Sequence, residues 1–250
     1  MRIILSPAKK MNIKTDDHLP KGKPVFPKET EEIMRFMQGL SLEQAQALWK
    51  CNDAIASENY ERFQTMDLDR AMTPAILSYD GIAFQYMGPG VFQYDEFDYV
   101  QDHLRILSAF YGVVKPMDGV TPYRLEMQAK AQISGKKNLY DFWGDKLYQE
   151  VIDDSHIIIN LASKEYSKCI EKYLKPTDTY ITCIFGEFVG EKVVQKGVYA
   201  KMARGEMVRY MAEHHLEDPE GMKGFDRLDF RFHQELSDEK TYVFIRSASK

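Results

Sequence analysis

The stretch that decides the fold is His-Ile-Ile-Ile-Asn-Leu-Ala-Ser-Lys-Glu-Tyr, residues 156–166. Residues 156–161 form a short apolar run, which predicts a buried strand. Ser163 can then cap a helix that continues to residue 173. Proteins of the α/β class commonly bind ligands where such a strand ends, because free amides and the positive end of a helix dipole meet there. No glycine-rich loop follows this strand, which argues against the usual nucleotide cradles.

The segments on both sides of this unit also alternate between strand and helix patterns. Strands are predicted over residues 2–5, 74–81, 179–189 and 192–195, and a hairpin across residues 237–239 closes the chain. Helices are predicted over residues 29–37, after the capping residues Ser41 and Asn52, and over residues 95–111, 139–151 and 199–214. Because no repeat or linker interrupts the pattern, we expect residues 1–250 to form a single compact α/β domain of the α+β type, with helices flanking a mixed sheet.

Composition narrows the class of protein. The chain is 44% hydrophobic and 28% charged, which is typical of a globular protein, and no stretch approaches the ~18 apolar residues of a membrane-spanning helix. Its formal net charge of -5 argues against nucleic acid, although a local basic cleft would escape this average. The three cysteines form no C-x-x-C pair, which suits reduced thiols. We therefore expect a cytoplasmic protein with no membrane partner.

Short motifs lie in order along nearly the whole chain. They are Leu-Ser-Pro-Ala-Lys (5–9), Phe-Asp-Tyr (97–99), His-Leu-Arg (103–105), Phe-Tyr-Gly-Val (110–113), Pro-Tyr-Arg-Leu-Glu-Met (122–127), Leu-Tyr-Asp-Phe-Trp-Gly-Asp (139–145), Ile-Asn-Leu-Ala-Ser-Lys-Glu-Tyr (159–166) and Tyr-Ala-Lys-Met-Ala-Arg-Gly (199–205). In these motifs the chain resembles the peroxide-stress protein YaaA family of bacteria. The resemblance implies a cytosolic protein of the hydrogen-peroxide response that limits damage from intracellular iron, with a mixed α/β fold and a DNA-binding cleft.

Residues 110–116 suggest one way of gripping DNA. A long helix would end at a glycine, and a proline would begin the next helix, as in a helix-hairpin-helix element. Loop amides and a nearby lysine would then face a phosphate, and the contacts would be Gly112, Val113, Val114 and Lys115. The alternative is a helix that ends at glycine and continues as an ordinary loop.

Residues 122–127 alternate between polar and apolar side chains. In an extended strand Arg124 and Glu126 share one face, while Leu125 and Met127 share the other. The guanidinium of Arg124 suits a phosphate or a carboxylate equally well. A ligand role and a salt bridge are therefore both open for this pair.

Basic residues are also concentrated on the predicted helix 199–214. Lys201, Arg204, Gly205 and Arg209 fall within an arc of about 140°. Gly205 costs about 1 kcal/mol relative to Ala inside a helix, which indicates that a backbone, a packed neighbour or a phosphate comes close there. Packing against a strand is the alternative to a ligand role for this face.

Metal chemistry has little support in the sequence. The six histidines show neither H-x-H nor H-E-x-x-H spacing. Asp95, Asp98 and Asp102 could share one helix face and offer oxygen ligands, but the pattern favours a solvated acidic face. We expect no metal site and no cofactor.

The functional prediction is a DNA-binding or DNA-protecting factor with a basic cleft. The candidate residues for binding DNA phosphates or a small anionic ligand are Lys9, Arg105, Gly112, Val113, Val114, Lys115, Arg124, Asn160, Ser163, Lys201 and Arg204. The alternative is an enzyme acting on a nucleotide or a nucleic acid, with Arg124 and Ser163 holding phosphate and Glu126 acting as acid or base. A buried Glu126 beside converging basic groups would favour the enzyme, whereas a broad open groove would favour the binding protein.

Overall fold

A mixed sheet forms the centre of the protein, and its strands lie in the order β11-β12-β9-β8-β1-β5-β6, with β10 paired to β9. The computed structural model describes residues 1–14, 18–70 and 73–247. Five neighbouring strands of the sheet are parallel: β1 (Arg2–Leu5), β5 (Leu104–Ser108), β8 (Ile157–Asn160), β9 (Thr179–Val189) and β12 (Thr241–Arg246). Three antiparallel strands complete it: β6 (Gly112–Val114), β10 (Lys192–Val194) and β11 (Phe230–Phe232). The predicted fold class, a mixed sheet flanked by helices, is confirmed.

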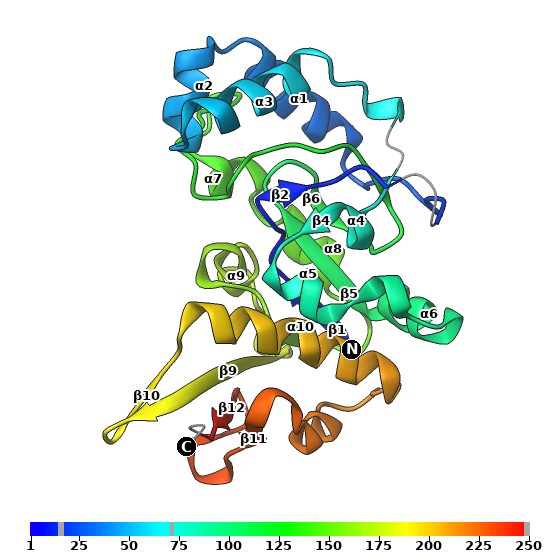
Figure 1. Ribbon diagram of the computed structural model, residues 1–250, viewed down its shortest axis with the longest axis vertical. Coiled ribbons are helices and arrows are strands. Elements are labelled where there is room, and N and C mark those ends of the chain that lie inside the picture. The colour runs from blue at the N-terminus through cyan, green and yellow to red at the C-terminus, as the bar shows by residue number, and fades with distance from the viewer. Residues whose placement is uncertain (15–17, 71–72, 248–250) are drawn as a thin grey trace.

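Helices cover the sheet, and three of them form a group at one end of the molecule (Figure 1). This group comprises α1 (Pro27–Gln38), α2 (Leu42–Trp49) and α3 (Asp53–Gln64). The other helices are α4 (Ala75–Ser78), α5 (Ile82–Met87), α6 (Tyr94–His103), α7 (Leu139–Trp143), α8 (Lys146–Val151), α9 (Lys164–Glu171) and α10 (Gly197–Glu213). Short 3-10 turns are η1 (Leu68–Arg70), η2 (Pro89–Val91), η3 (Pro219–Gly224), η4 (Arg227–Asp229) and η5 (Gln234–Leu236). Two small ladders pair β2 (Lys10–Met11) with β4 (Tyr79–Asp80), and β3 (Thr73–Pro74) with β7 (Gly119–Val120).

Local sequence patterns predicted several helices and strands correctly. The Ser41 hydroxyl accepts the amide hydrogen of Gln44 while the Gln44 side chain accepts that of Ser41, which is the predicted capping box. Asn52 caps α3 through the amide of Ile55. The decisive unit is also confirmed, since β8 runs directly into α9.

The prediction of one helix over residues 95–111 is wrong. Helix α6 ends at His103, and Leu104 begins β5, which pairs with β1. Every residue of β5 is buried, including Arg105 and Ser108, so both faces of the strand lie inside the protein. A strand buried on both faces lacks the alternation of a half-exposed strand, and periodicity alone does not distinguish it from the buried part of a helix.

The helix-hairpin-helix interpretation is wrong for the same reason. Gly112 has φ +78° and forms the turn after β5, and residues Gly112, Val113 and Val114 make up β6, which pairs with β5. A Cβ at residue 112 would lie 2.8 Å from the Trp143 ring, so this glycine is enclosed by the core. These backbone groups belong to a buried ladder and are not available to a phosphate.

Two further boundaries differ from the prediction. The expected strand over residues 74–81 is interrupted, because Ala75–Ser78 form the single helical turn α4 between β3 and β4. The expected helix over residues 139–151 is divided into α7 and α8 at Gly144, which has φ +56°. A residue with positive φ cannot continue a right-handed helix, and glycine adopts it without strain.

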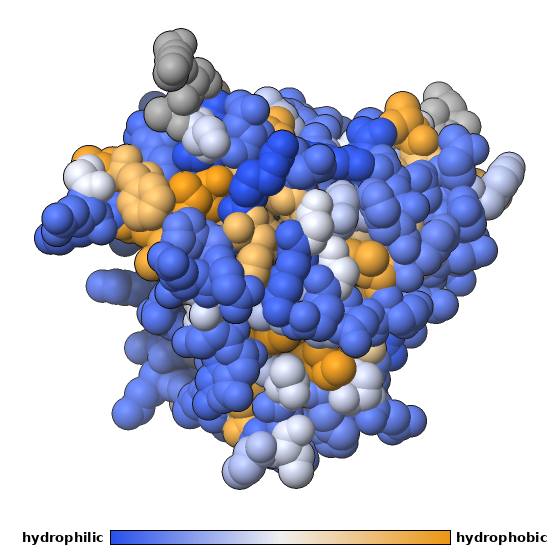
Figure 2. All heavy atoms as spheres, turned by 90° about the horizontal axis from the view of Figure 1, so that it is seen from below, coloured by the Kyte–Doolittle hydropathy of each residue, from blue (hydrophilic) through white to orange (hydrophobic). Residues whose placement is uncertain are grey.

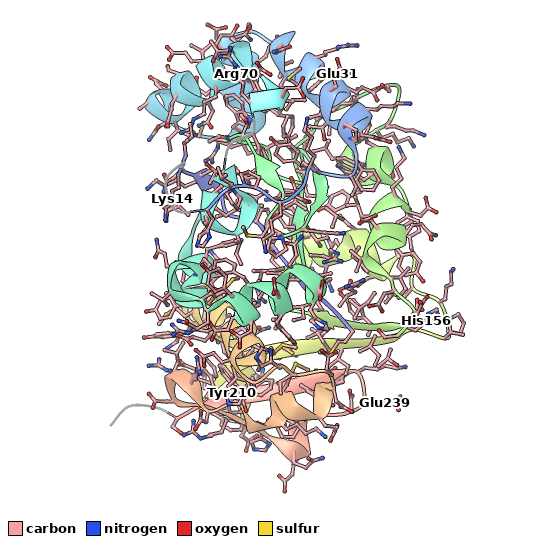
Figure 3. All side chains as sticks on the ribbon, turned by 90° about the vertical axis from the view of Figure 1, so that its right-hand side faces the viewer. Lys14, Glu31, Arg70, His156, Tyr210 and Glu239 are labelled. Carbon is pink, nitrogen blue, oxygen red and sulfur yellow. The ribbon has the colours of Figure 1, made fainter. Side chains whose placement is uncertain are left out.

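The outer surface is polar around this core. Figure 2 shows the face at the β11–β12 end as mostly hydrophilic, with small separated hydrophobic patches. In Figure 3, Glu31 and Arg70 lie at the end formed by α1–α3, and Glu239 lies at the opposite end. Within the described residues, no helix combines the length and the apolar character needed to cross a membrane.

Candidate functional site

A cavity of about 500 Å³ opens at the carboxyl ends of the central strands β1 and β8. This is the edge at which α/β sheets place their ligands. Five segments line it: the turn after β1, the β4–α5 junction, the extended segment 123–126, the β8–α9 junction and one face of α10. We call this cavity the cleft; its polar and charged lining residues are Ser6, Lys9, Lys10, Asp80, Arg124, Glu126, Ser163, Glu165, Lys201 and Arg204.

Two serines join the strand ends at the base of the cleft. The amide of Ser163 donates to Ser6 Oγ at 2.8 Å, and the Ser6 hydroxyl donates to Ser163 Oγ at 3.1 Å. Ser163 occupies the N-cap position of α9, but its side chain makes no capping hydrogen bond. Its own hydroxyl hydrogen is therefore available to an acceptor in the cleft, so the predicted cap does not account for this residue.

Arg124 and Glu126 lie on one face of their segment, as the alternation predicted. Arg124 Nη2 donates to Glu126 Oε1 at 3.4 Å, and Lys9 Nζ lies 2.9 Å from Glu126 Oε2. Glu126 is only 15% exposed, so both contacts are partly shielded from water. The salt-bridge and ligand interpretations of Arg124 are thus compatible, because Nε of Arg124 is buried without a hydrogen-bond partner among the described residues.

Glu165 also places its carboxyl group in the cleft, and it was not among the candidate site residues predicted from the sequence. The amide of Gln128 donates to its Oε1 at 3.2 Å. Burial raises the pKa of Glu165, the Gln128 amide partly lowers it, and the negative charge of Glu126 raises it again. Ser6 was missed as well; both residues stand inside the quoted motifs, and Ser6 directly follows a predicted strand, which was the available signal.

Helix α10 supplies two basic side chains, Lys201 and Arg204. In the described parts of the chain, no carboxylate lies within ion-pair distance of either. Nε of Arg204 is buried without a hydrogen-bond partner among those residues. Burial lowers the pKa of Arg204, and the neighbouring thiol of Cys183 only partly opposes this effect. A half-buried guanidinium without a counter-charge is a strong position for an anionic group.

Gly205 explains how α10 reaches the cleft. A Cβ at this residue would lie 1.9 Å from the Ala83 carbonyl oxygen and 2.9 Å from the Met87 amide nitrogen, both in α5. Figure 1 shows α5 and α10 lying next to each other. Of the three partners considered for Gly205, the structure therefore identifies a packed backbone.

Other side chains that line the cleft are aromatic or form an ion pair with each other. Tyr123 OH is bonded to Ser108 Oγ at 2.7 Å and to Tyr79 OH at 3.1 Å, which fixes its ring. Burial raises the pKa of Tyr123 to about 12. Lys10 Nζ lies 2.7 Å from Asp80 Oδ2, and hydrogen bonds from Lys10 and its neighbours lower the pKa of Asp80 to about 2. Phe84 and Tyr166 supply further aromatic surface.

The structure brings together six of the predicted residues and leaves six elsewhere. Lys9, Arg124, Glu126, Ser163, Lys201 and Arg204 line the cleft. Arg105, Gly112, Val113, Val114, Lys115 and Asn160 are not among the residues that line it.

The residues outside the cleft have structural partners. The Arg105 guanidinium is buried and donates to the carbonyl oxygens of Gln101 and Leu104 at 3.1 and 2.9 Å. The Lys115 amide donates to Asp118 at 2.8 Å. Asn160 Oδ1 accepts the Ala162 amide hydrogen at 2.9 Å, so it shapes the turn that positions Ser163.

Possible metal ligands do not gather in the described chain, where no group of three or more His, Cys, Asp or Glu side chains could hold an ion. Asp95 instead contacts His215 and Asp98 contacts Lys21.

Comparisons with known proteins place the chain in one family. A family model described as peroxide stress protein YaaA matches residues 1–236. A UPF0246 protein of Agathobacter rectalis is 61% identical over 98% of this chain and 99% of its own length. UPF0246 proteins of Lachnoclostridium phytofermentans and Desulfitobacterium hafniense are 53% and 52% identical, over 100% of this chain and 98% and 100% of their own lengths.

Proposed function

The chain belongs to the peroxide stress protein YaaA family, and from this premise we propose that it acts in the bacterial cytoplasm as a DNA-binding factor that limits iron-dependent oxidative damage. The cleft holds one phosphate-bearing unit of the DNA. The observation that carries the proposal is Arg204, a half-buried arginine whose Nε has no hydrogen-bond partner and whose guanidinium has no carboxylate partner among the described residues. Phosphate oxygens would supply the missing hydrogen-bond acceptors and the missing charge.

The charge of the cleft supports an anionic ligand in a protein whose formal net charge is -5. Five basic side chains line it (Lys9, Lys10, Arg124, Lys201 and Arg204) against three carboxylates (Asp80, Glu126 and Glu165), so the balance is 5 − 3 = +2 when all are ionised. A local positive cleft attracts anions even when the whole molecule is acidic.

The size of the cleft favours a single nucleotide unit over a duplex. A cavity of about 500 Å³ matches an ordinary small-molecule site, whereas a duplex needs an open groove along its backbone. A nucleotide of a single strand, or one extruded from a duplex, would present both a phosphate and a base to such a cavity.

The salt dependence of DNA binding tests this proposal. Because Lys201 and Arg204 together hold the one phosphate in the cleft, the K201A/R204A variant should reduce the log–log salt slope by about 0.7, the contribution of one phosphate contact with a single strand. Fluorescence anisotropy with a labelled single-stranded oligonucleotide over a series of salt concentrations measures the slope. The matched control is K136A/K137A, which removes two exposed lysines outside the cleft and should change the slope much less. An unchanged slope in a folded K201A/R204A protein would remove α10 from the interface, and no binding by the parent at low salt would refute the proposal.

A second candidate function is an enzyme that acts on a nucleotide. The specific observation in its favour is the pair Glu126 and Glu165, two partly buried carboxylates in one cavity, and the basic groups beside Glu126 are the arrangement that the sequence analysis associates with an enzyme. This arrangement provides groups that can accept and donate protons.

A further inference from the structure

Glu126 and Glu165 lie in the same cleft but have different surroundings. Both oxygens of Glu126 face cations, Lys9 at 2.9 Å and Arg124 at 3.4 Å. Glu165 accepts the Gln128 amide, and no lysine or arginine of the described chain forms an ion pair with it. Paired carboxyl groups in unequal environments are typical of an acid and a base that act on one substrate.

The environment of Glu165 raises its pKa above the ordinary value of a glutamate. Burial and the nearby charge of Glu126 raise its pKa, while the Gln128 amide and the charge of Lys9 oppose this in part. Burial also raises the pKa values of Tyr140 and Cys169 to about 12, so both stay neutral near pH 7. The titratable groups that surround Glu165 are Lys9, Glu126, Tyr140, Tyr166 and Cys169.

The unpaired cations and the two glutamates of the cleft come from different elements. Lys201 and Arg204 on α10 have no ion-pair partner in the described chain, whereas the two glutamates lie on segment 123–126 and on α9. Aromatic rings accompany the glutamates, because Tyr123 precedes Arg124 and Tyr166 follows Glu165. A ligand with a phosphate at one end and a planar base at the other matches this division.

We propose that the cleft hydrolyses the N-glycosidic bond of a nucleoside 5′-phosphate unit, with Glu165 as general acid and Glu126 as general base. This inference rests on the proposed function, since it uses the same cleft and the same phosphate contacts. The carboxylates would repel an attack on phosphorus, and the phosphate is held by Lys201 and Arg204 on α10. The reacting bond is therefore the one between the sugar and the base, whose cleavage develops positive charge on the sugar.

Water is the only co-reactant that this step needs. Glu126 accepts a proton from a water molecule, whose oxygen forms a bond to C1′. The C1′–N bond breaks, its electron pair goes to the base nitrogen, and Glu165 donates a proton to the departing base. The products are the free base and the sugar 5-phosphate, and a proton passes from Glu126 to Glu165 through solvent to restore the starting state.

Release of free base tests the inference. The full-length protein is incubated with dAMP, dCMP, dGMP, dTMP and 8-oxo-dGMP, and with a single-stranded oligonucleotide, and free bases are separated by chromatography. Isothermal titration measures nucleotide binding in parallel. We expect E165Q to retain binding within about twofold and to lose at least about 100-fold in base release, because a glutamine accepts the Gln128 amide but donates no proton to a leaving group. E239Q, which changes an exposed glutamate far from the cleft, is the matched control and should leave release unchanged.

The outcomes distinguish failure of this inference from failure of the proposed function. Base release that falls as pH rises through the titration of Glu165, and that is lost in E165Q, supports the inference. Nucleotide binding without base release overturns the inference and leaves the proposed function in place. Neither binding nor release, from free nucleotides and the oligonucleotide alike, overturns both. Release from only one of the two probes identifies whether the unit is taken free or within a strand.

Discussion

Asp118 is a buried carboxyl whose ionisation opposes folding. It is 3% exposed, and its Oδ2 accepts the Lys115 amide hydrogen at 2.8 Å. Burial raises its pKa to about 6, and the amide contact only partly compensates. Because the folded-state pKa lies above the unfolded value, the stabilisation is complete below about pH 4 and is lost as pH rises through about 6.

The D118N variant should remove this pH dependence. Its free energy of unfolding, relative to that of the parent, should increase by about 2–3 kcal/mol between pH 4 and pH 8, because asparagine keeps an acceptor and carries no charge. Urea unfolding at a series of pH values measures the difference. D154N, at an exposed aspartate, is the control. Parallel pH profiles for D118N and the parent would contradict the prediction.

At the scale of elements, the contact between α5 and α10 determines where the basic side chains of α10 lie in the cleft. The two backbones meet at Gly205, where a side chain would overlap the Ala83 carbonyl oxygen of α5. Backbone atoms cannot move aside as a flexible side chain can. Any side chain at residue 205 must therefore displace α10, and Lys201 and Arg204 would move with it.

A glycine pair on the same helix tests this packing. G205A should lower the free energy of unfolding by about 3 kcal/mol through overpacking, whereas G197A should leave it unchanged or raise it by up to about 1 kcal/mol. Gly197 begins α10, and a Cβ there would meet no atom within 4 Å. Thermal unfolding of both variants measures the effect. Equal stability of G205A and the parent would show that α5 and α10 are not in close contact.

The elements also show what local sequence can predict. The capping box at Ser41 and the cap at Asn52 were predicted correctly because their hydrogen bonds lie within four residues. Residues 104–108 were assigned to a helix, since the strand that pairs with them, residues 2–5, lies about a hundred positions earlier. The hydroxyl of Ser163 was expected to cap its own helix, and it is hydrogen-bonded instead to Ser6, which is 157 positions away in the sequence.

At the scale of the whole molecule, the cleft collects side chains from five separate segments. Lys9, Arg124 and Arg204 were selected from motifs that the chain shares with a known family, and each lines the cleft. The proximity of Glu165 to Glu126 had no signal in the sequence, because it depends on how α9 packs against segment 123–126. Charge and spacing identify candidate groups, whereas their relative ionisation depends on the assembled fold.

The thiols give a prediction for the protein as a whole. Cys169 and Cys183 are buried, and burial raises the pKa of each to about 12, so neither is a reactive thiolate near neutral pH. A C51S/C169A/C183A variant should therefore protect peroxide-treated cells as well as the parent does. Survival after a hydrogen-peroxide challenge measures this, with immunoblotting to compare abundance. Loss of protection at equal abundance would indicate thiol chemistry.

The position of β1 in the sheet also sets the order in which the chain can fold. Ile4 pairs with Arg105 on one side and with Asn160 on the other, so the first strand made is an interior strand and waits for both neighbours. At a synthesis rate of about 5–20 residues per second, that wait lasts roughly 8–30 s on the ribosome. An apolar strand with two unpaired edges is prone to wrong association during this interval. Assembly of the centre is consequently a late event, and the nascent chain is a natural client for chaperones that shield exposed apolar segments.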